Sequence, residues 1–296
     1  MRIRQLIHLY SKLNKNFNTM QSTNQVNPFS KNAWDQRANH YRKNTELFSF
    51  SPAATLGNML EISKAKNIVE MACATGVFSL YYLKTFNNAE TYISCDFSDK
   101  MIEIANGIKA ETEGLSKNTK HEFRVANAED LSFINDESQD VYIGNLCIHL
   151  ITDADKALQE AKRILRKGGR IGLSVPVIED GSLLALIFSS FREASKVIPE
   201  GRSPYYLSTP EALTKIVKDN GFEVVYVWDD CFRFPCSNIE EVDALLNGED
   251  CGPMYMKFDE ETRKEIRAKV VKGFEKMRAE FVAPYMKMLS IVATKP

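Results

Sequence analysis

The fold is decided by the stretch Ile68-Val69-Glu70-Met71-Ala72-Cys73-Ala74-Thr75-Gly76. It begins as an apolar, strand-like run with an acidic residue, Glu70, and continues with small residues at positions 72, 74 and 76. Small residues let a backbone approach a ligand closely, and a helix that begins directly after them presents free N–H groups. The stretch therefore predicts a strand, a ligand-binding turn and a helix. A dinucleotide fingerprint would need its third small residue at position 77, which is Val, so the spacing argues against a dehydrogenase.

Around this stretch, short β-branched runs alternate with helical patterns, which is typical of a parallel sheet with crossover helices. The predicted strands are 67–72, 91–96, 122–126, 140–146, 170–175, 222–227 and 288–294. The ends of the helices carry recognisable signals. Ser98 is placed as an N-cap, and Thr209 precedes a Pro at the first helical position. We expect the helix after residue 153 to end at Lys167-Gly168-Gly169, and the long amphipathic helix over 258–281 to end at Pro284.

Composition limits the classes of function. The chain has 296 residues, 44% of them hydrophobic, which is enough to bury a substantial core. Its net charge of −1 gives no general attraction to nucleic acid, and no apolar run is long enough to span a bilayer. Six cysteines without a CxxC pair favour a reducing compartment. Cys231, Cys236 and Cys251 could in principle hold a metal, but they match no common zinc spacing, so no metal site is predicted.

The N-terminal region, residues 1–28, differs from the rest. It has basic residues but no acidic residue, and its apolar residues recur at helical spacing before a polar stretch. This pattern resembles a mitochondrial transit peptide, although a disordered extension or a start at Met20 would also explain it. The expected location is therefore intracellular, in the cytoplasm or the mitochondrial matrix. Residues 29–296 are predicted to form one domain, with a lid insertion at about 178–210 and a helical addition at about 232–285.

The first stretch resembles the first motif of class I S-adenosylmethionine-dependent methyltransferases, an acidic residue followed by G-x-G-x-G, with Ala at the first two glycine positions. Four later segments resemble the family in the same order: 95–101 (D-x-S-x-x-M), 126–131 (G-D-A-E-x-L), 140–153 (the strand-four segment) and 158–169 (L-x-E-x-x-R-V-L-K-P-G-G). The closest resemblance is to ubiquinone/menaquinone-type and related small-molecule methyltransferases. It implies a Rossmann-like α/β fold: a seven-stranded, mostly parallel sheet with an antiparallel last strand and helices on both faces.

The resemblance also implies a cofactor and its site. S-adenosyl-L-methionine would be the methyl donor, and S-adenosyl-L-homocysteine the product. In the family, the position of Asp96 accepts the ribose hydroxyls, and the loop at Asn127 reads the adenine. The implied donor-binding residues are Glu70, Ala72, Cys73, Ala74, Gly76, Asp96, Phe97, Met101, Asn127, Ala128, Glu129, Asn145 and Leu146. For Asp96 and Met101, a helix cap and a core residue are the simpler alternatives.

The acceptor side is less defined by sequence. His149 follows the fourth strand and is the candidate general base for a hydroxyl or phenol acceptor, since an unperturbed His titrates near neutral pH. It could equally form a hydrogen bond across its loop. Trp34, Tyr41, Tyr205 and Tyr206 are candidates for the acceptor pocket, or for the packed faces of helices.

Three functions remain open from the sequence. The first is methyl transfer to a small, hydrophobic or aromatic molecule. The second is methyl transfer to a protein or nucleic acid, of which nucleic acid is not expected from the charge. The third is a methyltransferase-like scaffold without catalysis, for which the alanines of the first motif leave room. Neither the acceptor atom nor the oligomeric state can be predicted from the chain.

Overall fold

The structure, a computed structural model, describes residues 30–177, 182–195, 203, 205–233, 236–248, 251–280, 282 and 285–296. Several predicted features lie outside these residues: the N-terminal extension, much of the lid insertion between 178 and 204, and the helix end at Phe281 and Pro284.

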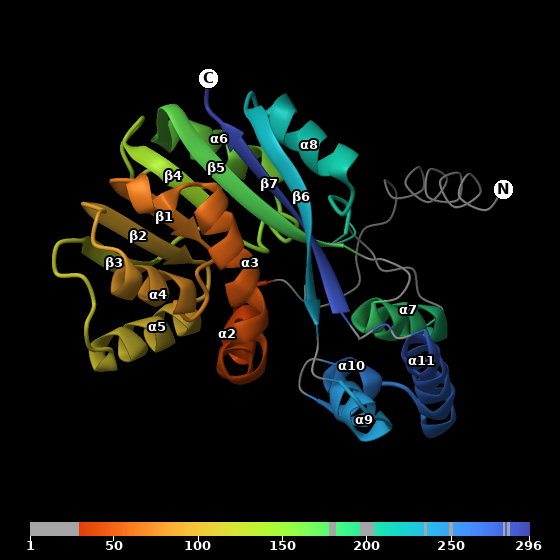
Figure 1. Ribbon diagram of the computed structural model, residues 1–296. Helices are drawn as coiled ribbons and strands as arrows, with labels where there is room; N and C mark the ends of the chain where they lie inside the picture. Colours follow the sequence, from red (N-terminus) through yellow and green to blue (C-terminus); the bar gives the residue numbers. More distant parts are fainter. Residues whose placement is uncertain are drawn as a thin grey trace.

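A seven-stranded sheet in the order β3-β2-β1-β4-β5-β7-β6 forms the centre of the molecule (Figure 1). The strands are β1 Asn67–Met71, β2 Thr91–Asp96, β3 Lys120–Val125, β4 Gln139–Gly144, β5 Leu165–Val177, β6 Glu223–Arg233 and β7 Tyr285–Thr294. The pairs β1–β2, β1–β4, β2–β3 and β4–β5 are parallel, whereas β7 runs antiparallel to both β5 and β6. The fold implied by the resemblance is thus confirmed. The strand order reverses between β1 and β4, where open α/β sheets bind their ligands.

Helices connect these strands, and their ends show where sequence signals held. They are α2 Lys31–His40, π-helix η1 Tyr41–Thr45, α3 Glu46–Met59, 3₁₀-helix η2 Ile62–Lys64, α4 Val77–Thr85, α5 Asp99–Glu111, α6 Ala154–Ile164, α7 Leu183–Ser195, α8 Pro210–Asp219, α9 Ile239–Asn247, α10 Gly252–Tyr255 and α11 Glu260–Ala279. Ser98 and Thr209 cap α5 and α8 as predicted. The predicted end of α6 at Lys167-Gly168-Gly169 is wrong. The helix stops at Ile164 because β5 begins there, and Gly168 donates its N–H to the carbonyl of Lys295.

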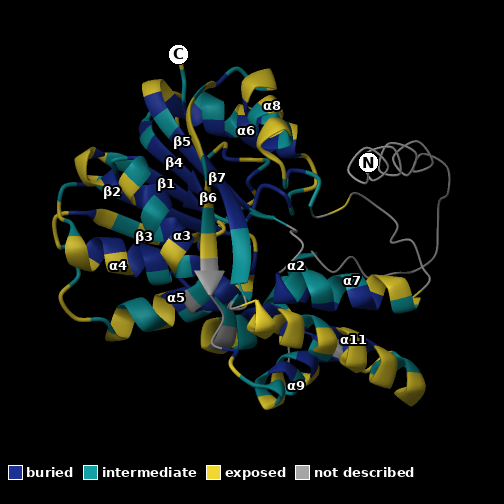
Figure 2. Cartoon of the chain, turned by 45° about the vertical axis from the view of Figure 1, so that its right-hand side comes forward, coloured by how far each residue is buried: buried dark blue, intermediate teal, exposed yellow. Residues whose placement is uncertain are grey.

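Two hydrophobic clusters cover the two faces of the sheet. One joins the strands to α3, α4 and α5, and the other joins them to α6 and α8. The neighbours Ile68 and Val69 on β1 belong to different clusters, as expected where successive side chains of a strand point to opposite faces. Figure 2 shows β1 and β4 almost wholly buried between these helical layers, whereas the edge strands β3 and β6 are largely exposed or half-buried. The carboxyl ends of β1, β2 and β4 lie at the edge of the sheet where a ligand is expected to bind.

A third hydrophobic cluster belongs to α7, α9, α10 and α11. These helices, here called the helical unit, lie together beyond the ends of β6 and β7 (Figure 1). Its core includes Leu183 and Ile187 from α7, and Val270 and Phe274 from α11. The described parts of the predicted lid insertion and of the helical addition therefore pack against each other, although they are separated by α8 and β6 in the sequence.

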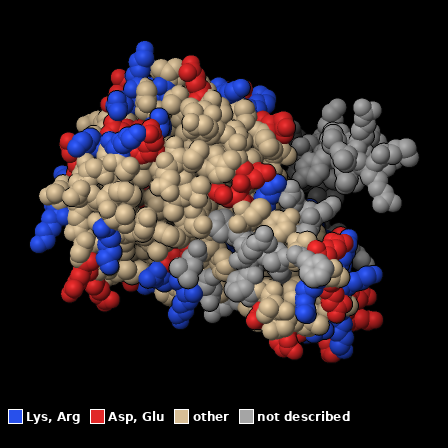
Figure 3. Space-filling view, in the orientation of Figure 1, with Lys and Arg blue, Asp and Glu red and all other residues tan. Residues whose placement is uncertain are grey.

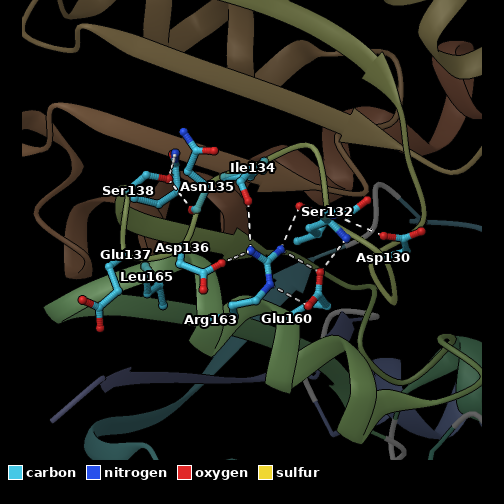
Figure 4. Close-up of polar contacts among 12 residues, drawn as sticks. Asp130, Ser132, Ile134, Asn135, Asp136, Glu137, Ser138, Glu160, Arg163 and Leu165 are labelled. Carbon is cyan, nitrogen blue, oxygen red and sulfur yellow. Dashed lines mark hydrogen bonds and ion pairs between the residues drawn. The ribbon is translucent and has the colours of Figure 1, made fainter.

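Arg163, in the last turn of α6, fixes the loop between β3 and β4 (Figure 4). Its guanidinium donates to the carbonyl oxygens of Leu131 and Ile134, each at 2.9 Å, and to the carboxylates of Glu160 and Asp136. Glu160 in turn accepts the backbone N–H of Leu131 at 2.7 Å. This explains why the Arg of the fifth sequence segment is structural: it holds the chain that follows the predicted adenine loop.

Candidate active site

The turn between β1 and α4 holds small residues at alternate positions in left-handed conformations. The φ angles are 55° at Ala72, 49° at Ala74 and 83° at Gly76. Alanine in this region costs about 1–2 kcal/mol per residue, because its Cβ approaches the following carbonyl. At Gly76 a Cβ would lie 2.4 Å from the ring of Phe123, so this position has room only for glycine. The turn therefore has the shape expected of a ligand-binding loop, with strain at its two alanines.

Asp96, buried at the end of β2, ties this turn to the next one. Its Oδ2 accepts the N–H of Ala74 and its Oδ1 accepts the N–H of Ser98, both at 2.9 Å. Burial is the main cause that raises the pKa of Asp96 to about 6, against the lowering effect of these bonds. One carboxylate thus joins the loops that follow β1 and β2, at the point where the strand order reverses.

Glu70 is the most constrained acid of the site. Its side chain is 4% exposed, and the hydroxyls of Ser79 and Tyr92 both donate to the same oxygen, Oε2, at 2.6 Å. No donor from the described residues bonds Oε1, and the side chain lines a cavity over the turn. Burial is the main cause that raises the pKa of Glu70 to about 7; the bonds from Ser79 and Tyr92 act against it, and the charge of Asp96 adds a smaller upward effect. One buried carboxylate oxygen is therefore available to a ligand.

The N-terminal helical segment, defined as α2, η1 and α3, covers the cavity from the other side. Tyr41, Glu46 and Ser49 line it, together with Phe50 and Ala53. Glu46 is 1% exposed, accepts the hydroxyl of Thr75 in the turn and pairs with Arg42. No motif flags Glu46, because a single acid in a helical stretch separated from the turn by a strand has no distinctive spacing.

Two contacts dock this segment on the core. Asp35 accepts the hydroxyl of Ser98 at 2.5 Å and the N–H of Lys100 at 3.2 Å, which fixes α2 at the beginning of α5. Trp34 packs edge-to-face on Tyr41, with 6.4 Å between ring centroids. Tyr41 thus lines the cavity over the turn, and Trp34 packs against the ring of Tyr41.

The cavity itself is small, and the described residues that line it include two acids and no basic side chain. Its free volume is about 20 Å³, room for one water molecule. Two lining side chains are carboxylates and none of the lining residues is Lys, Arg or His; the residues are Tyr41, Glu46, Ser49, Phe50, Ala53, Glu70, Ala72, Cys73, Ala74, Val77, Phe78 and Asn145. A cavity of this composition favours a positively charged ligand group.

The strand-four residues reach the same cavity. Asn145 lines it, donates its Nδ2 to the carbonyl of Ser49 at 2.9 Å and accepts the hydroxyl of Ser174 at 2.7 Å. Leu146 follows with a left-handed φ of 53°, and its N–H donates to Ser174. Asn145 therefore connects β4, β5 and the N-terminal helical segment at the cavity wall.

The predicted adenine loop is ordered by its own contacts. Asn127 is exposed, and its side-chain carbonyl accepts the N–H of Glu129 at 3.1 Å. Ala128 is buried, and Glu129 accepts the N–H of Asp153 at 3.0 Å. The side-chain oxygen of Asn127 thus accepts one hydrogen bond within the loop, and its second lone pair can still accept a bond from a ligand.

Other predicted residues lie apart from the cavity lining. Phe97 is 42% exposed, whereas Met101 is one of the buried residues of α5. His149 is buried in the turn after β4, four residues beyond Asn145, and is not among the lining residues. Tyr206 packs against the cluster beneath α6 and α8, and Tyr205 precedes it, so neither lines this cavity.

The described residues form neither a metal-binding cluster nor a membrane-spanning helix. Within them, no group of three or more His, Cys, Asp or Glu side chains is arranged to hold a metal ion, and Cys236 and Cys251 pack in the core of the helical unit. Among the helices that the structure describes, none is long and apolar enough to cross a membrane.

Known proteins resemble this chain in sequence and in fold. Residues 69–173 match a protein-family model described as a methyltransferase domain. The chain is 31% identical over 173 residues to the ubiquinone/menaquinone biosynthesis C-methyltransferase UbiE of Rickettsia prowazekii, covering 54% of this chain and 69% of that protein.

Solved structures with the same fold include a putative methyltransferase of Bacillus halodurans, with a TM-score of 0.56, 16% identity, and coverage of 83% of this chain and 99% of that one. Another is the (4+2)-cyclase SpnF, with a TM-score of 0.53, 20% identity, and coverage of 83% and 81%. At these identities the structures support the fold alone, and the cyclase shows that one fold hosts different reactions.

The strained turn gives a first prediction. Ala74→Gly should raise the free energy of unfolding by about 0.5–1 kcal/mol, because relief of the left-handed strain exceeds the entropy that glycine loses. Gly76→Ala should lower it by about 2–3 kcal/mol, because the new methyl group meets the packed ring of Phe123. Urea unfolding measures both. Equal effects of the two substitutions would contradict this description of the turn.

The buried acids give a second prediction. The folded-state pKa values of Glu70 and Asp96 lie above their ordinary values, so the stability they contribute is full at low pH and is lost as the pH rises. Without ligand, the free energy of unfolding should therefore fall between about pH 4.5 and pH 7. Glu70→Gln, which has no charge to bury, should flatten this fall and be more stable than the wild type at pH 8 by about 2 kcal/mol.

The control for this measurement is Glu90→Gln, because Glu90 is exposed on the surface. Urea unfolding at several pH values between 5 and 8 tests the difference. If the free energy of unfolding changed with pH in the same way in Glu70→Gln and the wild type, the buried charge of Glu70 would not destabilise the folded protein.

Proposed function

The chain belongs to the S-adenosylmethionine-dependent methyltransferase family, and from this we propose that it transfers a methyl group from S-adenosylmethionine to a small-molecule acceptor. The observation that carries the proposal is the free Oε1 of Glu70, a buried carboxylate oxygen without a donor in a cavity without a basic side chain. The donor presents an ammonium and a sulfonium group, which are the charges that such a cavity favours.

The other predicted donor residues fit this arrangement. Each oxygen of Asp96 accepts one backbone N–H and keeps a lone pair, so the carboxylate can still accept ribose hydroxyls. The turn over positions 72–76 would hold the methionine part, and Asn145 and Leu146 would complete its wall. Phe97, exposed beside Asp96, offers an apolar face to the adenosine, while Asn127, Ala128 and Glu129 would meet the adenine. Met101 would support this contact from the core.

The chemistry assigns simple tasks to the protein. The bound donor supplies an electrophilic methyl group on sulfur, and displacement at that carbon needs alignment and the exclusion of water. The N-terminal helical segment excludes water, because Tyr41, Ser49 and Phe50 close the cavity over the turn. His149 remains the proposed base for an acceptor that must lose a proton, since it follows the cavity residue Asn145 by four positions.

The acceptor is proposed to be hydrophobic or aromatic. The helical unit stands beyond the ends of β6 and β7 (Figure 1), and α7, whose buried apolar residues belong to the core of that unit, also contacts β7. UbiE, the relative with 31% identity, is named for a C-methylation in quinone biosynthesis. Together with Tyr205 and Tyr206, this supports a domain over residues 29–296 in which the insertion and the addition build the acceptor side.

A non-catalytic scaffold is the second candidate. The strain at Ala72 and Ala74 favours it, because the family's glycines would adopt these angles without cost. Binding of the donor separates the two functions.

Titration of S-adenosylmethionine into the purified protein should give a dissociation constant in the micromolar range or below. Asp96→Asn should weaken it by about 100-fold, because a charge-assisted hydrogen bond contributes about 1.5–3 kcal/mol and both ribose hydroxyls are affected. Asp219→Asn is the matched control, since Asp219 is exposed and, among the described residues, forms an ion pair with Lys215 alone. Isothermal titration calorimetry measures all three proteins. Absence of wild-type binding would rule out the enzyme and leave the scaffold.

The acceptor class needs a different experiment. Cell extract is separated into small-molecule, protein and nucleic-acid fractions, and each is incubated with the protein and methyl-labelled donor. Label should appear in the small-molecule fraction and partition into organic solvent. Label confined to protein would replace the proposed acceptor by a polypeptide. The Asp96→Asn variant shows the background in every fraction.

A further inference from the structure

Glu46 is a buried acid that the proposed site has not yet used. It is the first residue of α3, and only 1% of it is exposed. The helix continues from η1 into α3 without a break, and the backbone N–H of Glu46 donates to the carbonyl of Tyr41, so no free helix N-terminus holds this acid. Burying a charge is costly unless it is paired and hydrogen-bonded, so the partners of Glu46 decide what the side chain can do.

The partners of Glu46 neutralise it from one side only. Its Oε2 pairs with Arg42, whose side chain is 40% exposed and lines a separate apolar groove with Tyr81 and Lys84. Its Oε1 accepts the hydroxyl of Thr75, a neutral group within the turn. On the cavity side, Glu46 faces the lining that also holds Glu70. Two acids thus share a small cavity that contains no positive side chain.

Packing does not explain this arrangement. The segment α3 is held on the sheet by Leu56 and Leu60, both fully buried in the cluster that includes α4 and α5. The face of the molecule over α3 and α4 is mainly uncharged, with single Lys and Arg side chains at its margin (Figure 3). Glu46 accepts the buried hydroxyl of Thr75 from the turn, and the side of its carboxylate that lines the cavity is left for a ligand.

We propose that Glu46, together with the free Oε1 of Glu70, binds the α-ammonium group of the donor. This inference rests on the proposed function, because it assigns a residue to that site. An ammonium group has three N–H donors, so it can bond both acids at once, whereas a sulfonium has none. Glu46 acts from the N-terminal helical segment and Glu70 from β1, so the bound ammonium also fastens this segment over the turn.

The test separates the amino-acid part of the ligand from its nucleoside part. S-adenosylhomocysteine carries the ammonium, whereas 5′-methylthioadenosine has the same nucleoside and no amino-acid group. Glu46→Gln should weaken binding of S-adenosylhomocysteine by about 10–100-fold, the loss expected for a charge-assisted hydrogen bond. It should change binding of methylthioadenosine less than about 2-fold, because this ligand has no ammonium group for Glu46 to bond.

Two further variants complete the calorimetric series. Glu103→Gln, an exposed acid on α5 paired with Lys100, is the matched control and should change neither affinity. Glu46→Asp keeps the charge on a shorter side chain and should recover part of the preference for S-adenosylhomocysteine. The methylthioadenosine titration also reports on folding, because it uses the same nucleoside site in every variant.

The outcomes are distinct. If Glu46→Gln weakens both ligands equally, or neither, Glu46 does not recognise the ammonium and the inference is overturned. If Glu46→Gln does not fold, Glu46→Asp decides, since it should weaken S-adenosylhomocysteine more than methylthioadenosine. If the wild type binds neither ligand, the proposed function fails, and that result differs from a failure of Glu46 alone.

Discussion

The carboxylate of Asp96 is the contact on which the rest of the site depends. It holds the N–H of Ala74 in the turn after β1 and the N–H of Ser98 in the turn after β2. Alanine is costly at left-handed φ angles, so the turn needs such a bond to keep its shape. Through Ser98, whose hydroxyl donates to Asp35, the same carboxylate also positions the N-terminal helical segment. One buried acid thus connects the two loops and their cover.

The charge of the cavity follows from this construction. Burial raises the pKa of both Glu70 and Asp96, and Glu46 adds a third acid from outside the sheet. In the ligand-free protein the charges of Glu70 and Asp96 lower the stability at neutral pH. A cationic ligand would remove that penalty, so the strain and the charge of the empty site are both features that binding relieves. Stability is lower where function requires it.

Much of this could be predicted from the sequence because it is local. Glu70 and Asp96 lie next to their turns, and their strands are short apolar runs, so parallel pairing brings them to one edge. Ser98 and Thr209 carry cap signals that need only three residues to be recognised. Glu46 could not be found in this way, since its contact with Thr75 joins residues 29 positions apart from separate elements.

Other differences have equally physical causes. The end of α6 was misplaced because β5 begins at Leu165, where pairing with the neighbouring strand overrides the glycine signal at Gly168. The sequence predicts an insertion and a helical addition but not their contact, in which α7 and α11 bury their apolar faces on each other. Tyr205 and Tyr206 do not line the cavity. The sequence could not show this, because neither composition nor spacing says which side of the sheet a loop residue meets.

The acids over the turn should receive the positive end of the donor, and a crystal structure of the protein with bound S-adenosylmethionine would show whether they do. The ammonium nitrogen should lie about 3 Å from Oε1 of Glu70 and from the carboxylate of Glu46. An ammonium bound elsewhere, with Oε1 of Glu70 still lacking a donor, would contradict it.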